Sequence, residues 1–171
     1  METHRQVPES GGGAPNVTAL PRPILISSIG GIVLFISVFL DWYSASVSAS
    51  GVNLSGLGSA SASVSGWHAT DLAKLVALLA VIAVAGWAVE LFATDITLPV
   101  RAWQIAGGAG ALAVLLVLYR MISKPGGAHS EAFSFQSATI HLDISNAFGI
   151  YLALLAAVAT VVGAVMAMRS S

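Results

Sequence analysis

Four long apolar segments constrain this chain more than any other feature of its sequence. They cover about residues 24–40, 71–93, 102–121 and 147–168. A bilayer's hydrocarbon core is ~30 Å thick and a helix rises ~1.5 Å per residue, so ~20 apolar residues can cross it. Hydrocarbon offers the backbone no water, so each segment must satisfy its own hydrogen bonds as a helix. The sequence predicts an integral membrane protein of the all-α four-helix bundle class.

The composition supports this fold class and excludes several functions. Only 9% of residues are charged and 56% are hydrophobic, whereas soluble domains contain about 25% charged residues. The net charge is −1, and no basic patch with interleaved aromatics indicates a nucleic-acid partner. Cysteine is absent, which removes disulfides, thiolate metal ligands and cysteine nucleophiles. The sequence also lacks phosphate-binding glycine loops, nucleophile elbows and zinc-protease motifs, so we expect neither an enzyme nor a cofactor.

The distribution of charge predicts a topology. Residues 1–22 are polar and are expected to form a disordered cytoplasmic tail, followed by a single four-span domain over residues 23–169. The first apolar segment is longer than a signal peptide's core, which favours an uncleaved anchor. The segment Asp41–Ala69 contains no Lys or Arg, as expected of a translocated loop. We therefore expect a multi-pass plasma-membrane protein with both termini in the cytoplasm.

Two segments outside the predicted spans alternate with period two. In residues 42–66, serines alternate with alanines and valines. In residues 132–144, apolar residues alternate with a change of parity near Gln136–Ser137, which indicates a bulge or turn. This pattern is typical of half-buried strands, although a Ser/Ala linker is the alternative for the first segment. An isolated hairpin is only marginally stable. We therefore expect both segments to form one small extracytoplasmic antiparallel sheet, which would sit on the bundle with its apolar face inward.

Trp42 and Trp67 bracket the first alternating segment at the two predicted membrane exits. An indole suits the membrane interface, because its ring is apolar and its N–H can donate to water. The same argument makes Trp87 and Trp103 predicted interfacial anchors. Alternatively, Trp42 and Trp67 belong to a recognition surface.

Three ionisable residues are candidates for chemistry. His141 and Asp143 are two apart and share one strand face, where imidazole and carboxylate could bind zinc or copper. Their spacing is not a specific metal signature, so the favoured interpretation is a solvated strand face without metal. Glu90 lies well inside an apolar run. Because a carboxylate within a membrane is energetically costly, we treat Glu90 as a candidate functional residue. Its place near the inner end also permits a structural pair with Arg101.

Small residues recur at spacing four within the predicted helices. Ser27 and Gly31 form one such row, and the last span contains two more, Gly149, Ala153, Ala157 and Ala156, Thr160, Ala164. Rows of this kind let helix backbones approach closely in lipid. The pattern does not distinguish packing within the bundle from self-association.

Three short motifs carry a resemblance. They are Phe39-Leu40-Asp41-Trp42-Tyr43, Ser65-Gly66-Trp67 and Gly149-Ile150-Tyr151-Leu152. With the order of spans and strands, they resemble small four-span proteins of actinobacterial membranes, which implies an architecture but little about function. The layout is also loosely similar to claudin-type tetraspan proteins, but both cysteines of their first loop are missing here.

These observations predict a non-enzymatic interaction or accessory protein of the bacterial cell envelope. Besides the lipid bilayer, its partner would be an envelope protein or further copies of the chain, reached through the outer sheet. The alternative is a subunit of a transporter or channel that uses Glu90 and the glycine-rich third span. A Glu90 side chain in a polar bundle interior would favour transport, whereas an exposed one would favour the interaction protein.

Overall fold

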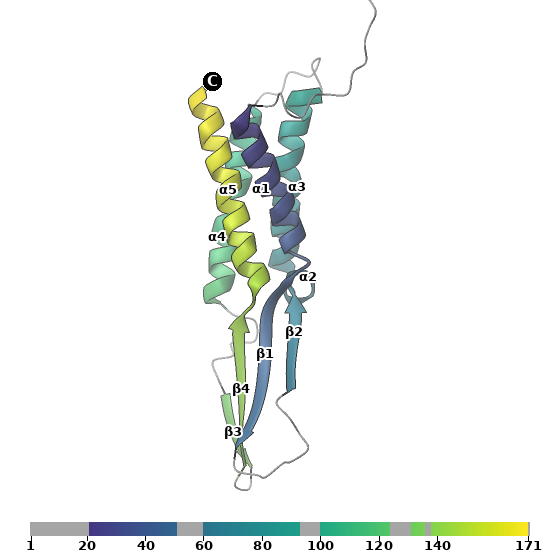
Figure 1. Ribbon diagram of the computed structural model, residues 1–171, viewed down its shortest axis with the longest axis vertical. Coiled ribbons are helices and arrows are strands. Elements are labelled where there is room, and N and C mark those ends of the chain that lie inside the picture. The colour runs from purple at the N-terminus through teal and green to yellow at the C-terminus, as the bar shows by residue number, and fades with distance from the viewer. Residues whose placement is uncertain (1–20, 51–59, 93–99, 124–130, 136–137, 171) are drawn as a thin grey trace, which may run out of the picture.

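The computed structural model describes residues 21–50, 60–92, 100–123, 131–135 and 138–170. This part of the chain is mostly helical, with a small antiparallel sheet (Figure 1). The helices are α1 (Arg22–Ser37), α2 (Gly66–Ala69), α3 (Asp71–Phe92), α4 (Ala102–Ile122) and α5 (Phe148–Ser170). The strands are β1 (Asp41–Ser50), β2 (Ala60–Ser65), β3 (Glu131–Phe135) and β4 (Ala138–Asn146). The expected disordered tail falls almost wholly on residues 1–20, outside the described part.

The four long helices pack side by side (Figure 1). Helix α1 contacts α5 and α3, and α4 contacts the same two helices from the other side. Most buried side chains between them are alanines, including Ala73, Ala80, Ala106, Ala153 and Ala157. Without a hydrophobic driving force in lipid, close backbone approach and van der Waals packing hold such helices together.

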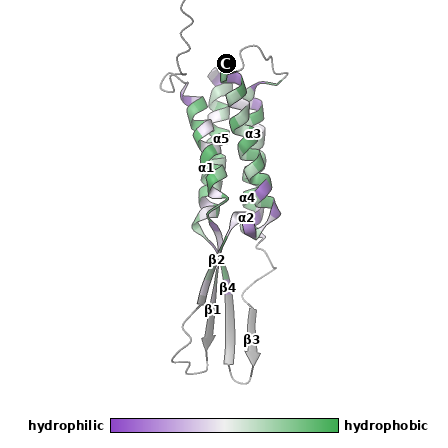
Figure 2. Ribbon diagram, turned by 90° about the vertical axis from the view of Figure 1, so that its right-hand side faces the viewer, coloured by the Kyte–Doolittle hydropathy of each residue, from purple (hydrophilic) through white to green (hydrophobic). Residues whose placement is uncertain are grey.

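Three helices, α3, α4 and α5, are long and apolar enough to cross a membrane. Figure 2 shows apolar residues along the middle of the helices. Helix α1 is shorter, with 16 residues, or about 24 Å. The rest of the predicted first span continues as tight turns, because the N–H groups of residues 38, 39 and 40 each donate to the carbonyl three residues earlier.

The sheet has the strand order β2-β1-β4-β3, and every neighbouring pair is antiparallel. This confirms the prediction that the two alternating segments form a single antiparallel sheet. The register mostly places polar residues opposite polar residues and apolar residues opposite apolar residues. Ser44 lies opposite Ser63 and Ser145, whereas Ala45 lies opposite Ala62 and Ile144. One face is therefore rich in hydroxyl groups and the other is apolar.

The prediction that the sheet sits on the bundle is wrong. In both views the strands extend away from the helix ends, roughly in line with the helices (Figures 1 and 2). Val64, on the apolar face, is 43% exposed, while Tyr43 at the base of the sheet is buried. The connections explain the difference. Only three residues separate α1 from β1 and one separates β4 from α5, so the central strands cannot fold back over the helices.

Candidate functional site: the sheet and its junction with the helices

Trp42 is fully buried where β1 leaves the helices. Its indole lies against Gly66 and Gly149, where an added Cβ would come within 2.6 Å and 3.0 Å of ring atoms. Its Nε1 donates to the Ser37 carbonyl at 2.8 Å. The two glycines create a slot that only a flat ring can fill. The predictions of an interfacial anchor or a recognition residue are therefore wrong for Trp42, which instead fixes the sheet to the helices.

Two further strand residues fasten the sheet to the end of α4. The Tyr43 hydroxyl donates to the Arg120 carbonyl at 3.1 Å, and the Asn146 amide donates to the Met121 carbonyl at 3.4 Å. The last carbonyls of a helix lack intrahelical partners, so these strand side chains cap α4. Burial raises the pKa of the Tyr43 phenol, and the nearby Arg120 charge opposes that shift only in part. Sequence reasoning missed this cap, because the two strand residues meet α4 only in the folded chain.

The hydroxyl-rich face carries most of the described polar contacts of the sheet. Ser63 donates to the Asp41 carboxylate at 2.6 Å, and the hydroxyls of Ser44 and Ser145 are 2.8 Å apart. Asp143, on the same face, is exposed and lies opposite Ser46 in the register.

The predicted pairing of His141 with Asp143 is supported by the backbone only. Strand β4 places both at alternate positions of one face, and the side chain of His141 lies outside the described part. Within the described residues, no group of three or more His, Cys, Asp or Glu side chains could hold a metal ion.

The two edges of the sheet differ in protection. Strand β2 reads Ala-Ser-Ala-Ser-Val-Ser, without charge or proline, and β3 starts with Glu131. Natural sheets protect exposed edges with lysine, proline or inward-pointing charge, because unpaired N–H and C=O groups can pair with another chain. The β2 edge has none of these devices in its own sequence, so it is the more accessible of the two to a further strand.

Trp67 is 38% exposed in the short helix α2. Its ring stacks on Phe39 at a centroid distance of 5.4 Å, and Phe39 makes an edge contact with Phe35. The three aromatic rings thus contact one another in a row from the last turn of α1 to α2. An exposed indole at the end of an apolar helix is what an interfacial anchor requires.

Glu90 is exposed near the C-terminal end of α3. Its carboxylate accepts a hydrogen bond from the Ala102 N–H at 3.1 Å, at the first residue of α4. A carboxylate is favourable there, because the first N–H groups of a helix lack partners and carry partial positive charge. The proposed pair with Arg101 does not form, since Lys74 with Asp71 is the ion pair found among the described residues.

No charged residue is fully buried within the described part, where the fully buried polar residues are Ser27, Ser37 and Thr160. The Ser27 hydroxyl links two other helices through hydrogen bonds. Trp87 Nε1 donates to the Ser27 hydroxyl at 2.9 Å, which donates to the Thr160 carbonyl at 3.1 Å. Trp87 is thus buried between α3, α1 and α5, and its predicted interfacial role is wrong.

Small residues lie at the contacts between the helices. A Cβ on Gly163 would lie 2.5 Å from the Ser27 backbone nitrogen, and one on Gly30 would lie 2.7 Å from the Thr160 hydroxyl. The row Ala156, Thr160, Ala164 of α5 is also buried, with Thr160 facing Gly30 of α1 and Ala164 facing Gly107 of α4. These contacts show that small residues let the helices of one chain approach closely.

Comparison of the chain with protein-family models, curated proteins and solved structures finds no match in any of the three. The resemblance to actinobacterial four-span proteins therefore stays a prediction.

Proposed function

We propose that this chain is a non-enzymatic integral membrane protein of the bacterial cell envelope that acts by presenting its β-sheet to a protein partner outside the membrane. The observation that carries the proposal is the junction. Trp42, Tyr43 and Asn146 fix the base of the sheet to helix ends. The strands therefore project from the helices in a fixed direction. A rigid, preorganised surface loses less conformational entropy on binding than a flexible loop.

The position of Glu90 supports interaction over transport. An intramembrane acid that couples transport must face the bundle interior or a water-filled cavity. The Glu90 carboxylate is instead exposed and bonded to the N-terminus of α4. The fully buried polar residues described are Ser27, Ser37 and Thr160, which are neutral and take part in helix packing, so the transport hypothesis has no buried carboxylate in this part of the chain.

The proposal includes a fourth span formed by α1 and its following turns. Turns of this tight type rise about 2 Å per residue, so Val38–Leu40 add about 6 Å to a helix of about 24 Å. The sum approaches the ~30 Å thickness of the hydrocarbon core. An even number of spans puts the start of α1 and the end of α5 on one side, and we assign that side to the cytoplasm because Asp41–Ala69, on the other side, contains no Lys or Arg.

The acting surface we assign is the β2 edge with the adjoining hydroxyl-rich face. An incoming strand would pair with the backbone N–H and C=O groups of Ala60–Ser65 that point away from β1. The side chains of that strand would meet the exposed serines of β2. Main-chain pairing gives affinity, while the flanking face gives specificity. The neutral, small side chains of β2 leave the approach to its edge sterically open.

Photo-crosslinking in native membranes tests this proposal. A photoreactive residue at Ala62, which is exposed on β2, should capture one reproducible partner from intact cells. The matched control places the same residue at Leu155, which is 68% exposed on the side of α5 and should capture only lipid. Ala62→Lys should reduce partner recovery, because a lysine on an edge strand opposes strand addition.

A different pattern of capture would contradict the proposal. Cross-links that join only copies of this chain, with no second protein at Ala62, would remove the accessory role. Flux measurements in proteoliposomes, with Glu90→Gln as the comparison, would then test the transport hypothesis directly.

A further inference from the structure

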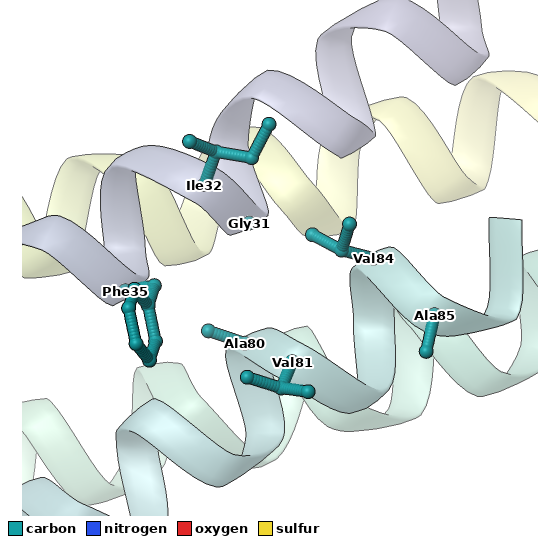
Figure 3. A pocket seen from close by; sticks show the side chains of 7 residues that line it. All are labelled: Gly31, Ile32, Phe35, Ala80, Val81, Val84 and Ala85. Atoms are coloured by element: carbon teal, nitrogen blue, oxygen red, sulfur yellow. The ribbon is translucent and has the colours of Figure 1, made fainter. Parts of the chain in front are cut away.

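A groove runs between α1 and α3 in the middle of the helical layer (Figure 3). Its volume is about 290 Å³, and no polar atom contributes to its accessible lining. Ile32 and Phe35 line it from α1, and Val81 and Ala85 line it from α3 (Figure 3). Gly31 also lines the groove, and α1 approaches α3 so closely there that an added Cβ would lie 2.7 Å from Val84 Cγ2.

Beyond the groove, two stripes of side chains run toward the sheet end of the helices. On α1, Phe35 contacts Phe39, whose ring stacks on Trp67. On α3, residues 74, 78, 81 and 85 share one face, since they follow at helical spacings of four, three and four. Lys74 therefore stands on the same stripe as Val81 and Ala85, two turns or ~10 Å nearer the sheet.

The sheet end of these two stripes combines an exposed indole with a cation. Trp67 and Lys74 are both exposed, and His68 is exposed beside the indole. Lys74 pairs with Asp71 at 2.6 Å, but both side chains are open to solvent. A solvent-exposed pair of this kind contributes little to stability and is screened by salt, so the ammonium group can turn toward another anion.

We propose that this groove binds one anionic phospholipid of the outer leaflet, with an acyl chain between α1 and α3 and the phosphate beside Lys74. The inference rests on the proposed membrane placement, which sets the groove at hydrocarbon depth and Trp67 at the interface. The apolar lining then fits an acyl chain, and the exposed Lys74, nearer the sheet on the same face of α3, complements a phosphate. An indole at the interface can donate to the lipid's ester carbonyl groups.

The shape of the groove favours a lipid chain over a helix from a second copy. Close helix contact in lipid requires small residues on both surfaces. Here the small residues Gly31 and Ala80 lie on the floor, while bulky Ile32, Phe35 and Val81 form the rim. A thin, flexible acyl chain can enter between these rim residues, whereas the rim keeps a helix backbone away.

Native mass spectrometry of the full-length protein, released from nanodiscs of equal phosphatidylglycerol and phosphatidylcholine, tests the proposal. We expect one retained lipid, with phosphatidylglycerol preferred about fivefold, the effect of one basic residue near an anionic surface. Ala85→Phe fills the groove from an exposed position and should lower lipid occupancy at least fivefold. The matched control is Ala111→Phe, the same change at an exposed position of α4, which should leave occupancy unchanged. Lys74→Gln should abolish the preference, and Lys74→Arg should retain it.

Three results would overturn the inference. Equal lipid retention in Ala85→Phe and Ala111→Phe would show that the groove is not the site. Loss of a dimer, rather than of a lipid, in Ala85→Phe would assign the groove to a second copy. An unchanged phosphatidylglycerol preference in Lys74→Gln would remove the headgroup assignment. Partner capture at Ala62 does not depend on these variants, so its failure with the lipid still bound would refute the proposed function alone.

Discussion

Replacing Trp42 by phenylalanine tests how the sheet is fixed to the helices. The change removes the indole N–H that donates to the Ser37 carbonyl at 2.8 Å. That carbonyl keeps a partner, because the Leu40 N–H also donates to it at 3.2 Å. The lost bond therefore costs about 1 kcal/mol. A smaller ring leaves a void of roughly 40 Å³ between Gly66 and Gly149, which adds about 1 kcal/mol at ~24 cal/mol per Å³.

Including the lost apolar contact of the larger ring, we expect Trp42→Phe to lower the free energy of unfolding by about 2–3 kcal/mol. The assay is reversible unfolding in mixed micelles of rising SDS fraction, followed by circular dichroism. Trp67→Phe is the matched control, since the same change at an exposed indole leaves no buried void. Equal stabilities of the two variants, within about 0.5 kcal/mol, would refute the argument that Trp42 holds the junction.

Four further predictions follow from the described packing. Gly163→Ala should destabilise the fold by about 1–3 kcal/mol in the same assay, since its Cβ would meet the Ser27 backbone at 2.5 Å. Gly108→Ala has no neighbour within 4 Å and should be neutral or stabilise by up to about 1 kcal/mol; the reverse order of these two would contradict the α1–α5 crossing. Ser27→Ala should cost about 0.5–2 kcal/mol, because the Trp87 N–H loses its acceptor, and a double variant with Trp87→Phe should show coupling between the two sites. For Tyr43, burial raises the pKa, so its stabilising effect is complete below pH 10 and is lost as pH rises through the raised value. Tyr43→Phe should remove that alkaline loss from the pH profile of unfolding, and a profile unchanged by the substitution would contradict it.

The sequence predicted the local elements well because periodicity encodes them directly. The apolar segments beginning near residues 71, 102 and 147 became α3, α4 and α5 with ends shifted by one or two residues. Period-two alternation located all four strands, and their pairing into one antiparallel sheet followed from the instability of a lone hairpin. In each case one short stretch of chain carried the whole signal.

Features that depend on contacts between distant segments were harder to predict. Trp42 and Trp87 were assigned to the interface from their positions near span ends, but both are buried. For Trp42 the signal was present in Gly66 and Gly149, which sit in motifs far apart in the chain and become neighbours only when folded. The direction of the sheet was missed because it depends on connection lengths of three residues and one, not on hydrophobic patterning.

In the candidate site, too, local features could be predicted from the sequence, whereas features that depend on distant residues could not. The sequence indicated that Glu90 could serve transport or structure, and it could not choose, because the carboxylate's partner is a backbone N–H twelve residues away. The hydroxyl-rich face was predictable from alternation alone. The unprotected β2 edge was not, since strand order decides which strands lie at the edges.

The most direct test of the central claim is labelling of single cysteines in intact cells with a membrane-impermeant thiol reagent. The chain contains no cysteine, so Ser46→Cys reports on the exposed face of the sheet and Ser170→Cys on the opposite end of the helices (Figure 1). The account predicts labelling of Ser46→Cys in intact cells and of Ser170→Cys only after permeabilisation. Labelling of Ser170→Cys but not Ser46→Cys in intact cells would place the sheet in the cytoplasm and contradict its role as an outward-facing interaction surface.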